Sequence, residues 1–186
     1  MSEWTKPTGY NDVLASIVAR IETSGIFMQG AKIEMAPGTL TEGWIAKASI
    51  PNSGAAFVAL GKLLSVKRRS DGMQEHLLNL GIFAAAPYGG RLDQAKSLND
   101  LVFNLTRLIE DNRFELVQAG KPSGFSGRNL FSLSLMKKGS ALWALEWRQS
   151  FMMFDQDGRQ LGAPVSSQLG RETEWPTSSE LANVSP

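Results

Sequence analysis

Apolar residues recur at helical spacing in two segments of the chain. In residues 11–24 the spacing of three and four predicts an amphipathic helix, with Asn11 or Asp12 as its cap and Gly25 at its end. Residues 93–111 carry a longer apolar stripe, which predicts a second and longer helix. The stripe consists of Leu98, Leu101, Val102, Leu105, Leu108 and Ile109.

Two long segments between these helices have the composition of strands. Residues 55–66 and 76–86 are rich in Val, Leu, Ile and Phe and lack helical spacing. Ser70, Asp71 and Gly72 lie between them as turn formers, so we expect an antiparallel pair. The second segment is apolar at both strand parities, which predicts a central strand covered on both faces.

Shorter segments complete the predicted sheet. We expect short strands over 32–35 and 114–118, and a loop rich in glycine over 120–127. Apolar and polar residues then alternate in 131–136 and again in 143–148, on either side of a Lys-Gly pair. This pattern predicts a final hairpin with one apolar face turned inward.

The final hairpin is rich in aromatic residues, and two interpretations remain open for them. Trp143 and Trp147 share the strand parity of Leu145, so they are expected to pack as core under the long helix. Together with Phe151 and Phe154, they could instead anchor a contact between subunits, because aromatic residues are favoured there.

The patterns together predict an α/β (α+β) fold over residues 1–154. Its sheet is mainly antiparallel and is flanked by an N-terminal helix and a long central helix. Residues 155–186 are rich in Ser, Thr, Pro and Gln and carry two arginines against five carboxylates, a net charge of −3 that leaves +4 on the rest. This acidic arm is expected to be extended and solvated. Alternatively, it becomes ordered on a neighbouring subunit with Trp175 as an anchor.

Composition narrows the functional classes. The chain has 186 residues, enough for one domain, and no cysteine, which excludes disulfides, thiolate nucleophiles and cysteine zinc sites. It has no apolar run long enough to span a membrane and no hydrophobic signal segment at its start, so we expect a soluble chain. Its net charge of +1 lowers the expectation of nucleic-acid binding.

Candidate catalytic residues are few. His76 is the only histidine, so a serine hydrolase would depend on it, with Ser126 as nucleophile. The surrounding residues 124–127 lack the spacing of a nucleophile elbow. Residues 155–158 begin like a calcium loop, but the glycine comes at the fourth position and not at the sixth. We therefore expect a noncatalytic protein without a cofactor or metal, and keep the Ser126–His76 hydrolase as the weaker alternative.

A basic run, Lys67, Arg68 and Arg69, falls at the predicted turn between the two long strands. It could contact an acidic surface or a phosphate backbone, although such a run is commonly just a solvated hairpin tip. No aromatic residues stand beside it to stack on bases, so specific readout of nucleic acid is not expected. The acidic arm of a neighbouring copy is a partner to test.

The order of these elements resembles the tail terminator, or tail completion, proteins of long-tailed bacteriophages, especially the Mu-like prophage group. The resemblance covers residues 11–154, and two segments, 37–53 and 155–186, depart from it. It rests on three stretches: the opening Asn-Asp-Val-Leu-Ala-Ser-Ile-Val-Ala-Arg-Ile of residues 11–21, the strand end Gly-Ile-Phe-Ala-Ala-Ala of residues 81–86, and a final group formed by Arg128, Asn129, Leu130, Phe131, Gly139, Leu142, Trp143, Glu146 and Trp147. Within the final group, Arg128, Leu130, Phe131 and Gly139 resemble the family's Arg-x-Leu-Phe motif and glycine turn.

This resemblance implies a function in virion assembly. It implies a homohexameric ring that caps the tail tube, stops its elongation and offers a surface to the head–tail connector proteins. The implied partners are other copies of the chain, the tube protein and the connector. The implied location is the head-proximal end of the virion tail, after assembly in the host cytoplasm. Another tail, neck or baseplate subunit is the alternative within the same class.

Overall fold

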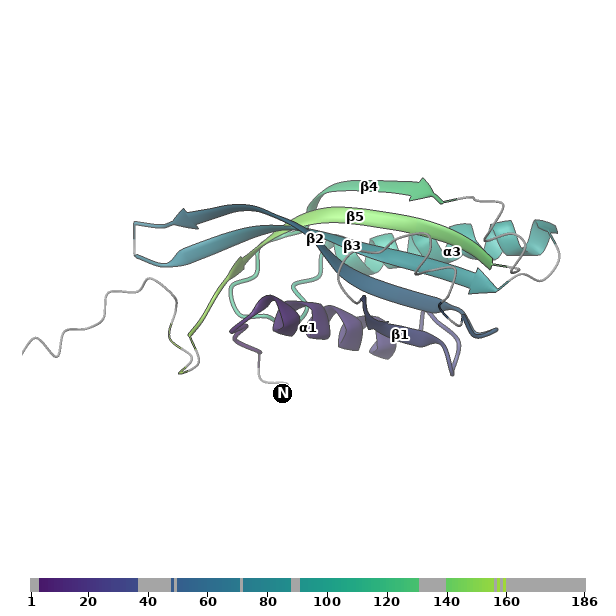
Figure 1. The fold of residues 1–186 in the computed structure, drawn as a ribbon, viewed down its shortest axis with the longest axis horizontal. Helices are drawn as coiled ribbons and strands as arrows, with labels where there is room; N and C mark the ends of the chain where they lie inside the picture. The colour runs from purple at the N-terminus through teal and green to yellow at the C-terminus, as the bar shows by residue number, and fades with distance from the viewer. Residues whose placement is uncertain are drawn as a thin grey trace, which may run out of the picture.

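The computed structural model describes residues 4–36, 48, 50–70, 72–87, 91–130, 140–155, 157 and 159. These residues form an α+β fold with two helices and a five-stranded mixed sheet of order β1-β2-β3-β5-β4 (Figure 1). Only the β1–β2 pair is parallel. The elements are α1 (Tyr10–Thr23), β1 (Lys32–Met35), β2 (Ala55–Arg68), β3 (Gln74–Pro87), α3 (Arg91–Glu110), β4 (Ser123–Asn129) and β5 (Ser140–Met152).

Both predicted helices are present. α1 begins after Gly9, and the carboxylate of Asp12 accepts hydrogen bonds from the backbone N–H groups of Thr8 and Gly9, at 2.8 and 3.1 Å. Asp12 thus stabilises the helix start from inside the first turn, because these N–H groups have no partner within the helix. The helix ends before Gly25, whose φ of 71° is left-handed. α3 begins two residues earlier than expected and ends one residue earlier.

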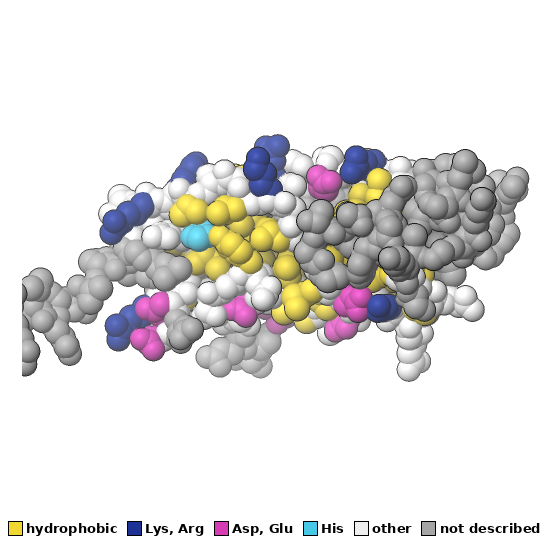
Figure 2. All heavy atoms as spheres, in the orientation of Figure 1, with side chains coloured by type: hydrophobic (Ala, Val, Ile, Leu, Met, Phe, Trp, Pro, Cys, Tyr) yellow, Lys and Arg dark blue, Asp and Glu magenta, His cyan; other side chains and the backbone are white. Residues whose placement is uncertain are grey.

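The two long strands form a hairpin, and β3 lies at the centre of the sheet, as predicted. The strands extend closer to the turn than expected, to Arg68 and from Gln74. Gly72, with φ of 83°, donates its backbone N–H to the carbonyl oxygen of Arg69 at 2.9 Å. Figure 1 shows the hairpin tip extending past both helices, and Figure 2 shows Lys and Arg side chains on this part of the molecule.

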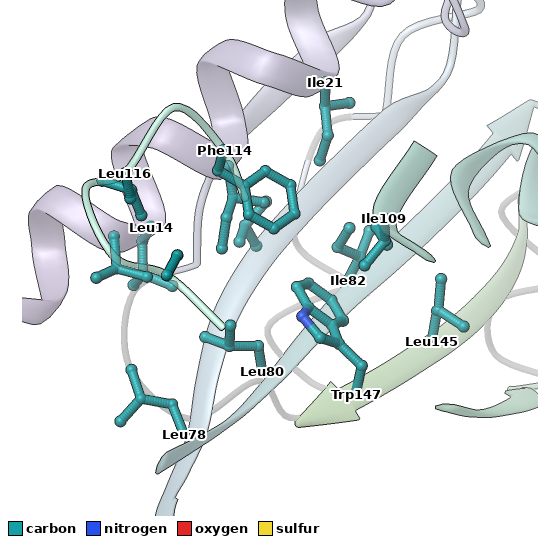
Figure 3. Packing of buried hydrophobic residues seen from close by; sticks show 14 of the residues in the cluster. Leu14, Ile21, Leu78, Leu80, Ile82, Ile109, Phe114, Leu116, Leu145 and Trp147 are labelled. Carbon is teal, nitrogen blue, oxygen red and sulfur yellow. The ribbon is translucent and has the colours of Figure 1, made fainter. Parts of the chain in front are cut away.

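The main core lies between one face of the sheet and the two helices. Trp147 of β5 is fully buried beside Phe114, and Ile82 of β3 and Ile109 of α3 point into the same cluster (Figure 3). α1 contributes its apolar stripe, Val13, Leu14, Ile17 and Ile21. A smaller cluster on the opposite face contains Phe57 and Leu142. Both predicted amphipathic stripes therefore face this sheet.

The connections after α3 differ from the prediction. Residues 114–118 are not a strand: Phe114, Glu115 and Gln118 have φ between 54° and 56°, and only an isolated bridge joins Leu116 to Thr5. The predicted loop over 120–127 is largely strand, since β4 pairs antiparallel with β5. Backbone hydrogen bonds join β4 to β5, and they form without the alternation of apolar and polar residues from which strands are predicted. The predicted first strand of the final hairpin, 131–136, lies outside the described residues.

Neither α1 nor α3 is both long enough and apolar enough for a membrane span.

Candidate docking surface

Within the described residues, the outer half of β2 has one edge with which no other strand pairs. β1 pairs with β2 only from Ala55 to Val58. From Ala59 to Lys67, no strand of the described chain pairs with the outer edge of β2. An unpaired edge presents a row of backbone donors and acceptors, so it is a ready template for another strand.

The side chains along this edge differ between its two faces. Leu63 and Val66 stand opposite Leu78 and His76 of β3, on the face that the helices cover farther along the sheet, and they are 40% and 48% exposed. Lys62 and Lys67 stand opposite Asn79 and Glu75, on the other face, and are also exposed. We call Lys62, Leu63, Val66 and Lys67 the docking surface.

Two irregularities give this edge its shape. The register between β2 and β3 shifts between Leu60 and Lys62 and again between Leu63 and Ser65, which leaves Gly61 and Leu64 as extra residues. At Gly61 a Cβ atom would lie 3.0 Å from the side-chain nitrogen of Asn79, so the strand approaches its neighbour closely there. Such bulges increase the twist of a strand. An isolated glycine inside a strand pattern is the one sequence signal that indicates this feature.

His76 and Tyr10 connect the docking surface to α1. The hydroxyl of Tyr10 lies 2.8 Å from Nδ1 of His76, and Nε2 of His76 is buried with no hydrogen-bond partner among the described residues. Burial lowers the pKa of His76, because a charged imidazole would lose hydration there. Figure 2 shows the chain's only histidine, in cyan, bordered by hydrophobic side chains in yellow, with basic side chains in blue farther out. His76 is therefore a partly buried strand residue that hydrophobic side chains surround.

The structure does not bring Ser126 and His76 together. Ser126 pairs with Glu146 of β5, and His76 pairs with Phe151. The two β5 residues have opposite parity in an uninterrupted register, so Ser126 and His76 lie on opposite faces of the sheet. Direct proton transfer from Ser126 to His76 is impossible in this arrangement.

The aromatic residues of the last strand are mostly core. Trp147 and Phe151 are fully buried and Phe154 is 3% exposed, so within one chain these side chains pack in the core. Trp143 is half-buried; its indole nitrogen lies against Gly127 and has no hydrogen-bond partner in the part of the chain that the structure describes. Trp175 lies outside the described residues.

The remaining predicted residues are spread over the sheet. Lys67, Arg68 and Arg69 are exposed at the hairpin tip, where the turn prediction placed them. In the motif shared with the resembling family, Arg128 is exposed on β4 and Leu130 packs against the smaller cluster. Phe131 and Gly139 lie outside the described residues.

The described part of the chain also has shallow depressions. One, of about 430 Å3, lies between the ends of α1 and α3 and is lined by Arg20, Asn104 and Arg107 among others. Both arginines belong to the last turn of a helix, where a cation favourably complements the helix dipole. Among the described residues, no three His, Cys, Asp or Glu side chains form a group able to hold a metal ion.

The chain matches no protein-family model and no curated protein sequence.

Proposed function

We propose that the chain is a noncatalytic tail terminator, which forms a ring on the tail tube of a long-tailed bacteriophage, stops tube elongation and receives the head connector. The proposal draws on the sequence resemblance over residues 11–154. The observation that carries it is the outer edge of β2 from Ala59 to Lys67, with which no strand of the described residues pairs and beside which Leu63 and Val66 are exposed.

This edge suits self-association. In a closed ring, one surface of each subunit meets a different surface of the next, and rotation leaves no surface unpaired. A bare strand with neighbouring apolar side chains offers both backbone hydrogen bonds and apolar area to such a contact. β4 stands at the opposite end of the strand order, so the two ends of the sheet present different surfaces, as a head-to-tail contact requires.

The partners follow from this role. Other copies of the chain form the ring, nominally six, and the ring's two sides meet the tube protein and the connector proteins. The finished ring belongs to the head-proximal end of the virion tail, after assembly in the host cytoplasm. No reaction is needed for this work, because a terminator acts by occupying the site where the next tube ring would add.

Assembly of the purified chain tests the proposal. Native mass spectrometry over a range of concentrations, with and without tail tubes, should detect a ring-sized oligomer, at least on tubes, since tube binding favours closure by mass action. Electron microscopy of particles made without the chain should show overlong tails. Absent tails would instead indicate a tube, neck or baseplate subunit, and a chain that stays monomeric and leaves tubes uncapped would refute ring assembly.

A variant of the docking surface connects this result to the structure. Leu63→Thr with Val66→Thr removes apolar area but keeps residues that favour strands. We expect the concentration for half-assembly to rise about thirtyfold, because each of the two substituted side chains loses roughly 1 kcal/mol at every contact. The urea midpoint should stay close to that of the unmodified chain, because both positions are exposed. Met28→Thr, at an apolar position that is 75% exposed, is the control and should assemble normally.

A further inference from the structure

We propose that the depression between the ends of α1 and α3 binds carboxylate side chains of a partner protein. Its volume is about 430 Å3. We call it the arginine depression, because Arg20 lines it on the side of α1 and Arg107 on the side of α3, together with Ile26, Asn104 and Leu108. The inference goes beyond the tail-terminator role and does not depend on it.

The first argument is that the charges in the arginine depression are of one sign. Arg20 and Arg107 are both exposed, and the described residues that line the depression include no carboxylate. Within the described chain, neither guanidinium group forms an ion pair. The helix dipole accounts for one cation at the end of each helix, but it does not account for their meeting in one depression. Their charge is therefore available to an anion from outside.

Hydroxyl groups at the end of α1 weaken the repulsion that its last carbonyl groups would exert on such an anion. Thr23 and Ser24 also line the depression. Oγ1 of Thr23 donates to the carbonyl oxygens of Ala19 and Arg20, at 2.9 and 3.3 Å. Oγ of Ser24 donates to the carbonyl oxygen of Ile21 at 2.6 Å. The carbonyl oxygens that a helix end leaves without partners carry its negative dipole charge, and these hydrogen bonds offset part of that charge.

The second argument is that α3 holds its donors in position. The guanidinium group of Arg107 lies 5.9 Å from the ring centroid of Phe103, one turn earlier in the helix. This cation–π contact restricts the side chain, so less entropy is lost when the guanidinium group binds. Asn104 lies three residues before Arg107, on the same side of α3, and its amide has no hydrogen-bond partner among the described residues. Two neighbouring groups of α3 therefore offer N–H donors to one ligand.

The third argument concerns the kind of ligand. Ile26 and Leu108 are partly buried against the main core, so they give the depression an apolar wall. A small molecule in a shallow depression keeps much of its surface in water, whereas small-molecule sites bury most of their ligand. A protein partner covers the rim with its own surrounding surface. Because guanidinium groups bind carboxylates through paired N–H groups, the complementary segment has acidic side chains on either side of an apolar one.

Titration of the isotopically labelled chain with short capped peptides, followed by NMR, tests the site. Acetyl-Glu-Leu-Glu-amide should shift the Nε–H resonances of Arg20 and Arg107 in a saturable way. The matched peptide acetyl-Gln-Leu-Gln-amide should bind at least about tenfold more weakly, because it lacks the carboxylates. Acetyl-Glu-Gly-Glu-amide should bind about threefold more weakly, because it loses the apolar contact with Ile26 and Leu108.

Variants of the chain connect the binding to the arginine depression. Arg107→Gln should weaken binding of acetyl-Glu-Leu-Glu-amide about tenfold, and Arg107→Lys about threefold, since lysine keeps the charge but not the paired N–H groups. Arg148→Gln is the matched control. It removes the same charge from the sheet face opposite the helices, because Arg148 follows the buried Trp147 in β5, and should change the affinity less than about twofold. Urea midpoints of all three variants should stay close to that of the natural chain, because both arginines are exposed.

The outcomes separate carboxylate binding from its alternatives. Saturable shifts that Arg107→Gln weakens and Arg148→Gln does not would support the assignment. Equal binding of the glutamine peptide, or equal shifts at Arg128 and Arg148 on the sheet, would overturn it. Inorganic phosphate is the remaining probe, and tighter binding of phosphate than of the acidic peptide would overturn the carboxylate assignment in favour of phosphate. None of these measurements involves assembly, so a failure of this site and a failure of the tail-terminator role are distinct results.

Discussion

At the scale of single residues, Gln149 shows how a buried polar side chain is satisfied by hydrogen bonds. It is a buried polar side chain of β5, 1% exposed, and all of its polar atoms are used. Its oxygen accepts from the indole nitrogen of Trp147 at 3.1 Å, and its nitrogen donates to the carbonyl oxygens of Asn112 and Gly120 at 3.1 and 2.9 Å. Gln149 thus joins both ends of the 112–120 loop to the sheet.

Replacing Gln149 by Leu should therefore destabilise the fold. The change keeps a similar volume but leaves the indole N–H and two carbonyl oxygens without partners, at a cost of about 2–3 kcal/mol. Urea unfolding measures the effect. Gln29→Leu, at an exposed position between α1 and β1, is the control and should change the free energy of unfolding by less than about 0.5 kcal/mol. Equal effects of the two substitutions would contradict the structural role of Gln149.

His76 makes stability depend on pH in a defined window. Burial lowers its pKa in the folded chain below the ordinary value of 6.5. As pH falls below about 6.5, the unfolded chain binds a proton first, so the free energy of unfolding decreases until the folded pKa is passed. Above that window both states are neutral at His76 and the contribution is fully present.

Urea midpoints of the natural chain and of a His76→Gln variant, measured between pH 7.5 and 5.5, isolate this effect. The natural chain should lose more stability than the variant over this range. Asp12, whose pKa is lowered mainly by the hydrogen bond from the Thr8 backbone, stays ionised there and contributes no slope. Parallel curves for the two chains would show that His76 is not desolvated in solution.

At the scale of elements, the loop after α3 shows how a correct burial pattern leads to a wrong element. Phe114 and Leu116 alternate with polar neighbours, as in a strand, and both are indeed buried. The backbone nevertheless takes left-handed φ values at Phe114 and Glu115, so the side chains reach the core from a turn. Alternation reports which residues are buried, but it does not report backbone handedness.

Glu115→Gly should stabilise the protein. A left-handed backbone costs a residue with a Cβ atom about 1–2 kcal/mol, while glycine adds a smaller entropy loss on folding, so we expect a net gain of about 0.5–1 kcal/mol. Thermal and urea unfolding measure it. Ala15→Gly, at an exposed position of α1 with ordinary helical geometry, should lose about 1 kcal/mol instead. A loss at both positions would indicate that φ at Glu115 is not left-handed in solution.

The other elements differ in how far the sequence determines them. α1, α3 and the β2–β3 hairpin were predictable, because each buries its own periodic apolar face. β4 was not predictable from Ser-Gly-Phe-Ser-Gly-Arg-Asn, which has a single apolar residue. β4 forms because the edge of β5 offers backbone donors and acceptors to it. That edge is available because of the strand order in the sheet, which no local sequence pattern encodes.

For the whole molecule, the position of each strand in the sheet decides which residues are available to a partner. The basic run at the hairpin tip could be located from turn residues alone. Its apolar neighbours Leu63 and Val66 could not, because they look like core until β1 is seen to end its pairing at Val58. Likewise, only the register shows that Trp147 and Phe151 face inward.

The extension of the β2–β3 hairpin past both helices has a dynamic consequence. Residues 61–68 are largely exposed, so bending or fraying the tip breaks few buried apolar contacts. The amide hydrogens of the tip should therefore exchange with solvent through small local openings. The amide hydrogens of the hairpin half that the helices cover should exchange only through global unfolding. The tip is able to adjust its curvature to a curved neighbour without loosening the core that supports it.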